Sequence, residues 1–527
     1  MKIISIGLVL LTCIALGETR ESIRLKQKRP GKSVRVQQTQ PITQTSGGSA
    51  NQALMQALTQ VQKGQYLQAA PNLFQLSRRA DFADDRDQIK FILGSALLEA
   101  NFNQIAAFQF VEVIKGGNKK YLRSAIEKLS IAADRLGDDT LLNYAIGKVN
   151  LQDFPGSLRD MILYRIGEVK TRAGFFAEAE ANFAKVPPNS RYFYQARYQR
   201  ALAMAESNRP KLAAQEFREL AAMRSRFGVH DPIRLAAQMG LARSLYQSQD
   251  WDGAIEAYRD IPRDSDQWYQ SLFESTWALL RNTQYRSALG QFHSLHSAFF
   301  AEDYNPESLI LRGITYLYIC KFEETQKTIG LFSSIYDPIF ETVRRLTDFK
   351  EGSIFAKDIQ MADEIRNGNA TSYRGRMPQM LARRILSEGD INRTLSYIDR
   401  LRDEMKRLES SGIGRTQLAR YGIRVLNHRM NNATISLGEL ARIHLLSIRN
   451  ELKDLKEQAS FLELETSTGK AELLKKKISG KSLAGTIDSN HDRTFYVQNG
   501  YEYWPFNGEY WIDELGNYHY LGKSSCE

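Results

Sequence analysis

The sequence has few cysteines and, after its first residues, no long apolar segment. Only 3 of the 527 residues are cysteine, which excludes the disulfide framework that holds small secreted domains together. No later segment approaches the run of about 18 apolar residues that a membrane-spanning helix needs. We therefore expect no membrane span in the mature chain. There is no phosphate loop, no dinucleotide-binding fingerprint and no Gly-x-Ser-x-Gly elbow, which argues against nucleotide-dependent enzymes and α/β-hydrolases.

Histidine is scarce as well, and its spacing does not suggest a metal site. Of the 7 histidines, only His293 and His296 are close in sequence, and no third ligand is near them. Zinc and similar metals need three or four converging ligands. Carboxylates are plentiful but lie on charged helical stretches, where they are normally solvated. We therefore expect no catalytic residue, no metal and no cofactor, which points to a protein that is not an enzyme.

The amino terminus has the pattern of an export signal. Lys2 is followed by a mostly apolar stretch from Ile3 to Leu16, and residues 15–17 offer the small residues that a signal peptidase reads. We expect residues 1–17 to be a signal peptide; the alternative is a lipoprotein signal that ends at Cys13. Export predicts a periplasmic protein, free or attached to the inside of the outer membrane.

Residues 18–51 have the composition of a disordered linker, with Gln, Thr, Ser, Gly and Pro and few residues able to build a core. Lys and Arg total 71 in the whole chain against 60 Asp and Glu, a net charge of +11. Seven basic and two acidic residues of the linker give +5 of that excess. The linker is either an electrostatic arm for anionic lipid or cell-wall polymer, or a solvated spacer. Export argues against nucleic acid as the partner.

Two cysteines remain once the signal peptide is removed. Cys320 lies within an apolar helical pattern, where a buried and inert thiol is expected. Cys526 is next to the last residue and has either the role of an exposed tether or none.

A repeat fills the chain from residue 52 onward. A small residue, a second small residue 12 positions later and an aromatic residue 16 positions later recur at intervals of 34 to 41 residues. The clearest copies are Gly167, Ala179 and Phe183; Ala201, Ala213 and Phe217; Ala242, Ala254 and Tyr258; and Thr276, Ala288 and Phe292, with further copies starting at Leu58, Gly94 and Gly313.

This pattern resembles the tetratricopeptide repeat (TPR) family, in which small residues let two antiparallel helices approach closely and the aromatic residue fills the space between hairpins. The resemblance implies an all-α fold in which residues 52–344 form a right-handed superhelix of helical hairpins. In the family the first helix of each hairpin lines a groove that binds protein partners. Carried over by position, the groove residues are Tyr164, Arg172, Tyr198, Glu206, Arg243, Tyr246, Phe273, Trp277 and Arg281, with Tyr318 at a further equivalent position. The alternative is that several of these side chains simply pack against the next hairpin. The Lys and Asn pattern with which some members clamp a terminal carboxylate is missing.

Residues 345–490 change to long charged helices. Apolar residues from Ala441 to Leu462 alternate spacings of four and three, which is typical of a coiled-coil seam. A shorter seam from Ile391 to Leu408 offers a partner for it, and residues 410–414 can turn between two helices. The seam predicts either an antiparallel pair within one chain or a homodimer.

The last segment, residues 491–527, is rich in aromatic residues and in Asn-Gly and Gly-Asn turns, which predicts a small β-meander lying on the helices. Its aromatic side chains serve either packing or a platform for glycan or a partner strand, with Trp504, Tyr510 and Trp511 as the candidates. Residues 504–511 also resemble the carboxyl-terminal tail of repeat-rich envelope proteins from gliding and predatory bacteria.

These observations favour a non-enzymatic scaffold of the bacterial envelope that holds protein partners in a secretion, outer-membrane assembly or motility apparatus. The alternative is a peptidoglycan enzyme or a glycan-binding protein with a superhelical domain. Periplasmic lytic transglycosylases also contain helical superhelices, but they need a compact catalytic domain, and only 37 residues follow the helices here.

Overall fold

The computed structural model describes residues 48–147, 155–224, 231–349, 351–478 and 509–522, together with Ser524 and Cys526. The expected signal peptide and almost all of the basic linker lie outside the described residues. The described chain is helical and contains no strand. Its first sixteen helices follow one another as α1 (Gly48–Gln62), α2 (Tyr66–Leu76), α3 (Arg86–Glu99), α4 (Asn103–Gly116), α5 (Lys119–Leu136), α6 (Thr140–Ile146), α7 (Arg159–Arg172), α8 (Phe176–Phe183), α9 (Phe193–Glu206), α10 (Pro210–Ala221), α11 (Pro232–Gln247), α12 (Trp251–Arg259), α13 (Trp268–Arg281), α14 (Tyr285–Leu295), α15 (Pro306–Tyr318) and α16 (Phe322–Thr347).

Seven of the helix pairs are closed by the same backbone turn. One residue between the two helices has a left-handed conformation. Its backbone amide and the amide of the following residue donate hydrogen bonds to carbonyl groups in the last turn of the first helix. In the α9–α10 hairpin, the Asn208 amide donates to the Ala205 carbonyl and the Arg209 amide to the Met204 carbonyl, both at 3.0 Å. The left-handed residues are Gly64, Asn101, Gly174, Asn208, Gln249, Thr283 and Cys320. A shared turn starts each second helix at the same point, so the hairpins have a common geometry.

The small and aromatic residues of the repeat meet inside the hairpins. A Cβ atom built on Gly167 would lie 2.4 Å from the Phe183 ring, and one on Gly94 would lie 2.8 Å from the Phe110 ring. Both phenylalanines are buried. In these two hairpins the close approach of the helices therefore depends on a residue without a side chain, and residues 48–347 contain a TPR-like array of helical hairpins.

The register that the sequence pattern predicts for the first hairpin is wrong by one residue. In the other hairpins the first small residue lies seven positions before the left-handed turn residue; counting back from Gly64 gives Ala57, not Leu58. Leu73, which is completely buried, then takes the place of the aromatic residue. The sequence pattern assigns this place to its neighbour Phe74, which lies one position after the true site.

Four further helices follow the array: α17 (Ser353–Arg366), α18 (Gln379–Leu386), α19 (Gly389–Ser410) and α20 (Gln417–Ile478). Helices α19 and α20 form an antiparallel pair across the turn at residues 411–416. The shorter seam does not lie against residues 441–462 as expected: Asp390 at the start of α19 is 3.1 Å from His444, so α19 lies along the first part of α20. The 441–462 seam is buried within the chain, where α20 packs against α16 and α17. This seam is not free to pair with a second copy.

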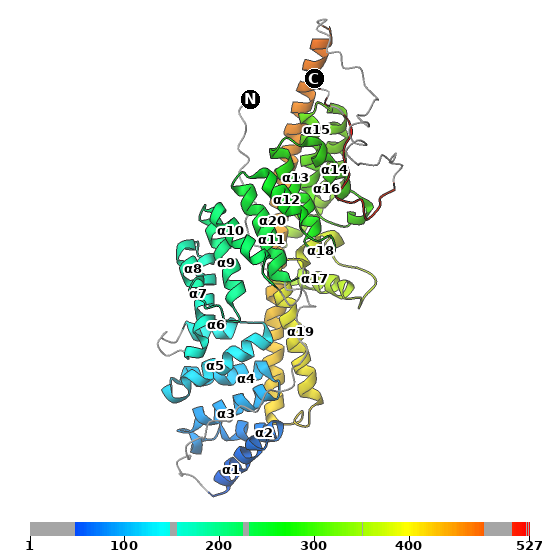
Figure 1. Ribbon diagram of the computed structural model, residues 1–527. Helices are drawn as coiled ribbons and strands as arrows, with labels where there is room; N and C mark the ends of the chain where they lie inside the picture. The colour runs from blue at the N-terminus through cyan, green and yellow to red at the C-terminus, as the bar shows by residue number, and fades with distance from the viewer. Residues whose placement is uncertain are drawn as a thin grey trace.

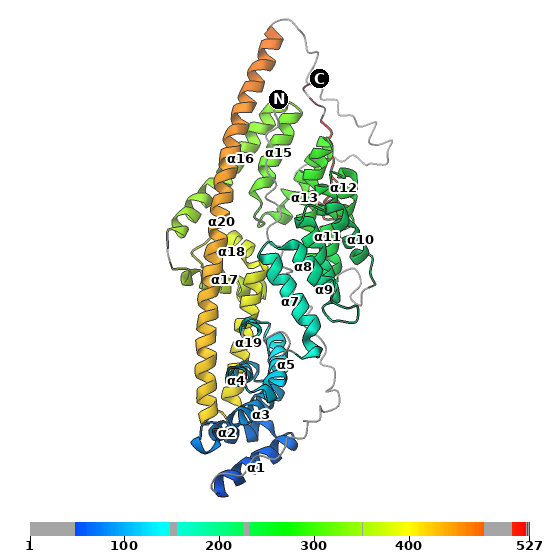
Figure 2. The same ribbon diagram turned by 90° about the vertical axis from the view of Figure 1, so that its left-hand side faces the viewer.

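Helix α20 runs along one side of the molecule and connects the two ends of the array (Figures 1 and 2). Near its start, the Tyr421 ring lies 5.1 Å from the Phe74 ring of α2. Near its end, Gly469 lies against the Phe322 ring of α16. These two points are about 70 Å apart along a straight helix. The helix therefore braces the first and last hairpins against each other.

The described part of the tail contains turns and no strand, which corrects the expectation of a β-meander for residues 509–522. The physical reason is that its backbone finds hydrogen-bond partners on the helices. The Gly516 amide donates to the Ser294 hydroxyl at 2.8 Å, and Gln291 donates to the Gly516 carbonyl at 3.0 Å. Residues 491–508, including Trp504, lie outside the described residues. In the described part of the chain, no helix is both long and apolar enough to cross a membrane.

Candidate functional site

The nine predicted groove residues fall on the first helices of four consecutive hairpins, α7, α9, α11 and α13. Three of them lie in the core. Tyr164 is 8% exposed, Tyr198 is 2% exposed and Phe273 is 4% exposed. Tyr164 contacts Phe183, and Tyr198 contacts Phe217, at ring-centre distances of 5.8 and 5.6 Å. These side chains pack between helices and leave little surface for a partner to contact.

The Arg243 side chain also has its bonding partners within the array. Its guanidinium makes two hydrogen bonds of 2.7 Å with the Glu274 carboxylate, which reaches it from α13 of the next hairpin. Tyr258 and Gln270 donate to the same carboxylate at 2.9 and 2.8 Å. Burial alone would raise the pKa of Glu274, but the Arg243 charge and these donors lower that pKa below its ordinary value. The pair stabilises the contact between two hairpins, a role that position in the repeat does not reveal.

The other five residues lie at or near the surface. Arg172, Glu206 and Arg281 are exposed, and each is the last residue of its helix. Tyr246 and Trp277 are half-buried, with the Tyr246 ring 5.1 Å from the Trp251 ring. The candidate site is therefore the carboxyl-terminal edge of the first helices, which we call the first-helix edge.

The same edge continues to α15, where Tyr318 is 57% exposed and stacks on Tyr285 at 5.5 Å. Tyr318 ends α15 as Arg281 ends α13, so its place follows from the repeat. Tyr285 is the residue that sequence reasoning missed, because it belongs to a second helix, α14. The first-helix edge thus contains Arg172, Glu206, Tyr246, Trp277, Arg281 and Tyr318.

The closest pair of histidines has structural partners. The Arg312 guanidinium lies 3.1 Å from the His296 Nδ1 atom, and the Ser308 hydroxyl lies 2.9 Å from its Nε2 atom. Burial, together with the Arg312 charge, lowers the pKa of His296 to about 3, so the ring is neutral at physiological pH. Since arginine can only donate, Nδ1 accepts and Nε2 donates to Ser308. His293 faces the tail and contacts the Tyr510 and Tyr518 rings.

Two of the three glycan-platform candidates, Tyr510 and Trp511, lie in the described part of the tail. Tyr510 is half-buried against His293, whereas Trp511 is 61% exposed. Trp504 lies outside the described residues, so whether the three form a platform stays a prediction.

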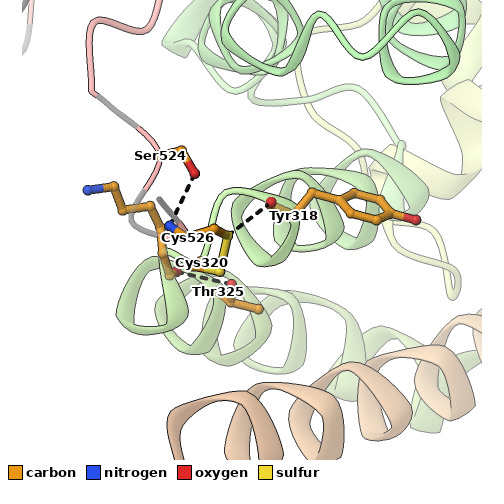
Figure 3. Close-up of a disulfide and its surroundings, with 6 residues drawn as sticks. Tyr318, Cys320, Thr325, Ser524 and Cys526 are labelled. Carbon is orange, nitrogen blue, oxygen red and sulfur yellow. Dashed lines mark hydrogen bonds between the residues drawn. A yellow bond between two sulfur atoms is a disulfide. The ribbon is translucent and has the colours of Figure 1, made fainter. Parts of the chain in front are cut away.

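Cys320 is not the inert thiol that its surroundings in the sequence suggested. It forms a disulfide with Cys526, 206 residues away (Figure 3). Cys320 is the left-handed residue of the turn between α15 and α16, where the exposed Cys526 at the end of the tail meets it. No sequence signal connects two cysteines across such a distance.

A shallow hollow lies between α16 and α20. Lys456 on its wall bonds Asp337 at 2.9 Å and lies 4.7 Å above the Phe340 ring. The charge is therefore satisfied by neighbours and directed along the surface. In the described chain, histidine, cysteine and acidic residues form no cluster of three suited to a metal.

No family profile and no curated protein sequence matches this chain. Among solved structures, the chain is similar to the crystal structure of the P58(IPK) TPR domain, with 11% sequence identity over 73% of this chain and 99% of that chain and a TM-score of 0.18. This TM-score is too low to show a shared fold. The assignment of a TPR-like array therefore rests on the shared turn and on the paired small and aromatic residues.

Proposed function

We propose that the protein is a non-enzymatic scaffold that binds protein partners along the first-helix edge. The observation that carries the proposal is the placement of Trp277 beside Arg281 at the end of α13, with Arg172 and Glu206 at the ends of α7 and α9. Tryptophan, tyrosine and arginine supply most of the binding energy at protein interfaces. An array of equivalent helix ends presents such side chains at regular intervals.

The compartment follows from the expected signal peptide and is supported by the disulfide. Disulfides persist in oxidising compartments such as the bacterial periplasm and are rare in the cytosol. Cys320 and Cys526 are the two cysteines that remain after cleavage at residue 17. We therefore place the scaffold in the bacterial envelope, as part of a secretion, outer-membrane assembly or motility apparatus. On this proposal the linker of residues 18–51 contacts anionic lipid or cell wall.

The test of the binding surface is a set of alanine variants used as bait in cross-linked envelopes. Trp277→Ala and Arg281→Ala should each weaken binding of the captured partner by about 2 kcal/mol or more, because a hot-spot side chain is lost. Both changes should weaken partner capture more than they lower the thermal stability, and Trp277→Ala, whose half-buried ring packs on the core, should lower the melting temperature more than Arg281→Ala. The control is Phe217→Ala, which removes a ring that is 1% exposed and should cost about 3–5 kcal/mol of folding stability. If Trp277→Ala melts as early as Phe217→Ala while its folded fraction still captures the partner, the first-helix edge is a packing surface and the proposal is wrong.

The test of the compartment is fractionation followed by sequencing of the mature amino terminus. A periplasmic or outer-membrane protein that begins near residue 18 is expected. A cytosolic protein with its first 17 residues intact would refute export.

A further inference from the structure

The tail lies across α14 as a peptide that turns at residues 512–516 and is held at several points. Leu515 is 1% exposed and is its buried anchor. The next residue, Gly516, bonds through its amide to Ser294 and through its carbonyl to Gln291, both on α14. On either side of this anchor, Arg263 donates to the Asp513 carbonyl at 2.6 Å and the Tyr520 amide donates to the Arg286 carbonyl.

Two glycines adapt this surface to a peptide backbone. A Cβ atom on Gly290 of α14 would lie 1.8 Å from the Tyr518 carbonyl oxygen, so any side chain there would displace the tail. On the tail, Gly516 has a φ of +84°, a left-handed conformation that turns the chain beside Leu272 and Trp268 of α13. The α13–α14 face and the tail are therefore matched in shape as well as in hydrogen bonding.

The far end of the tail is fixed covalently. Cys526 is exposed and joined to Cys320, and its amide bonds the Ser524 hydroxyl (Figure 3). With the disulfide intact, the tail is held at both ends, because its other end continues from α20. With the disulfide broken, it is held at one end and by the contacts around Leu515.

We propose that the α13–α14 face is a peptide-docking groove occupied by the chain's own tail, and that the Cys320–Cys526 disulfide is a redox latch that keeps it occupied. A dithiol reductant opens the latch: it gives two electrons and two protons, the sulfur–sulfur bond becomes two thiols, and the dithiol closes its own disulfide. The groove can then exchange its occupant for the same segment of a second copy. The inference uses neither the first-helix edge nor its partners, so it stands or falls separately from the proposed function.

The occupant in trans follows from the chemistry of the groove. It selects a segment that turns at a leucine followed by glycine, flanked by rings that contact His293 on one side and Tyr316 on the other. The tail of a second copy meets this description completely. The 30 residues between Ile478 and Glu509 supply up to about 100 Å of chain when extended, enough for the tail to reach a neighbour.

The test is fluorescence anisotropy with a labelled synthetic peptide of residues 509–522, which contains no cysteine. The proteins are the oxidised full chain, the same chain reduced with dithiothreitol, and the Cys320→Ser/Cys526→Ser variant. The reduced chain and the variant should bind the peptide saturably and at least ~10-fold more tightly than the oxidised chain, because a doubly tethered occupant has a high effective concentration. Peptide mapping of the oxidised chain should recover residues 320 and 526 joined.

Two matched controls separate the groove from unspecific binding. A peptide with Leu515→Asp should bind at least ~10-fold more weakly, since it would bury a charge at the anchor. The Gly290→Leu change in the reduced chain should abolish binding; the Leu515→Asp peptide decides the matter if that variant does not fold. Equal binding by oxidised and reduced chains, binding by none of the three proteins, an unlinked Cys526, or equal binding of both peptides would each overturn the proposal.

Discussion

The Glu404 carboxylate on α19 accepts hydrogen bonds from the backbone amides of Gln104 and Ile105, which are 300 and 299 residues away at the start of α4. The distances are 2.9–3.0 Å to Gln104 and 3.1 Å to Ile105. The residue that precedes α4, Phe102, has no side-chain acceptor for these amides. A carboxylate from a distant helix therefore caps α4, and it does so at a site that is 1% exposed.

We expect Glu404 to make folding stability depend on pH. Burial raises the pKa of Glu404 from its ordinary 4.5 to about 7, although the backbone donors favour the charged form. The folded chain then binds a proton that the unfolded chain has released, so this contribution is fully present below pH 4.5 and is lost as the pH rises through 7. At 1.36 kcal/mol per pKa unit, the loss is about 3 kcal/mol. Urea denaturation at pH 5 and pH 8 measures it.

The matched variant for this prediction is Glu404→Gln, which keeps an acceptor oxygen for the α4 amides but does not titrate. The difference in unfolding free energy between the chain and the variant should change by about 2.5 kcal/mol between pH 5 and pH 8, because part of the loss has already occurred at pH 5. Parallel pH profiles for the two proteins would show that the Glu404 pKa is not raised. Glu404→Ala should lose about 1–2 kcal/mol at either pH, because the cap itself is removed.

The Arg243–Glu274 pair should behave as a structural unit rather than a binding site. Arg243→Met leaves the buried Glu274 charge unpaired and should cost about 3–5 kcal/mol of folding stability. The double variant Arg243→Met/Glu274→Met should recover most of that loss, because no charge is left buried. Urea denaturation of the single and double variants gives the coupling energy. The exposed control Arg281→Ala should change stability by no more than about 0.5 kcal/mol; a loss as large as that of Arg243→Met would contradict this assignment.

A pair of glycine variants tests the close approach of helices in the repeat. Gly167→Ala places a methyl group against the Phe183 ring and should cost about 1–3 kcal/mol through overpacking. Gly330 lies inside α16, where an added Cβ atom would have no heavy atom within 4 Å. Gly330→Ala should therefore stabilise the helix by up to about 1 kcal/mol. Thermal melting of both variants suffices. Equal and small shifts for the two would mean that α7 and α8 do not need a glycine at their contact.

The repeat could be recognised from sequence because the residues that form the helix contact of each hairpin lie close together in the sequence. The spacing of Gly167, Ala179 and Phe183 reflects one helix contact within 17 residues, and the left-handed turn between the helices fixes that spacing. The same local signal misplaced the first hairpin by one residue, because Leu73 fills the position that an aromatic residue fills elsewhere. Repeat position also could not distinguish Arg281, which is exposed, from Arg243, which has a partner on the next hairpin.

The contacts that sequence could not supply join distant parts of the chain. The 441–462 seam shows that α20 has an apolar stripe, but not that α16 and α17 cover it. The capping of α4 by Glu404, the disulfide of Cys320 and the seating of Leu515 on α14 likewise connect residues hundreds of positions apart. Apolar and polar patterns report which face of an element is buried, whereas the identity of what covers it depends on the tertiary arrangement.

The brace formed by α20 should hold the first hairpins of the array in place, and Tyr421 is the residue that tests it. Its ring packs on Phe74, and Arg78 lies within 5.5 Å of the same ring. Tyr421→Ala removes an aromatic pair worth about 0.5–1.5 kcal/mol beyond its buried area. Because each 1.4 kcal/mol corresponds to a factor of about ten, amide hydrogen exchange in α2 should speed up by about tenfold or more. Exchange in α13 and α14, which lie near the other end of the array, should not change. Ile443→Ala, at a position of α20 that is 57% exposed, is the control and should leave α2 protected. If α2 exchanges at the same rate in the Tyr421→Ala chain as in the control, the first hairpins are stable without α20 and the helix is not a brace.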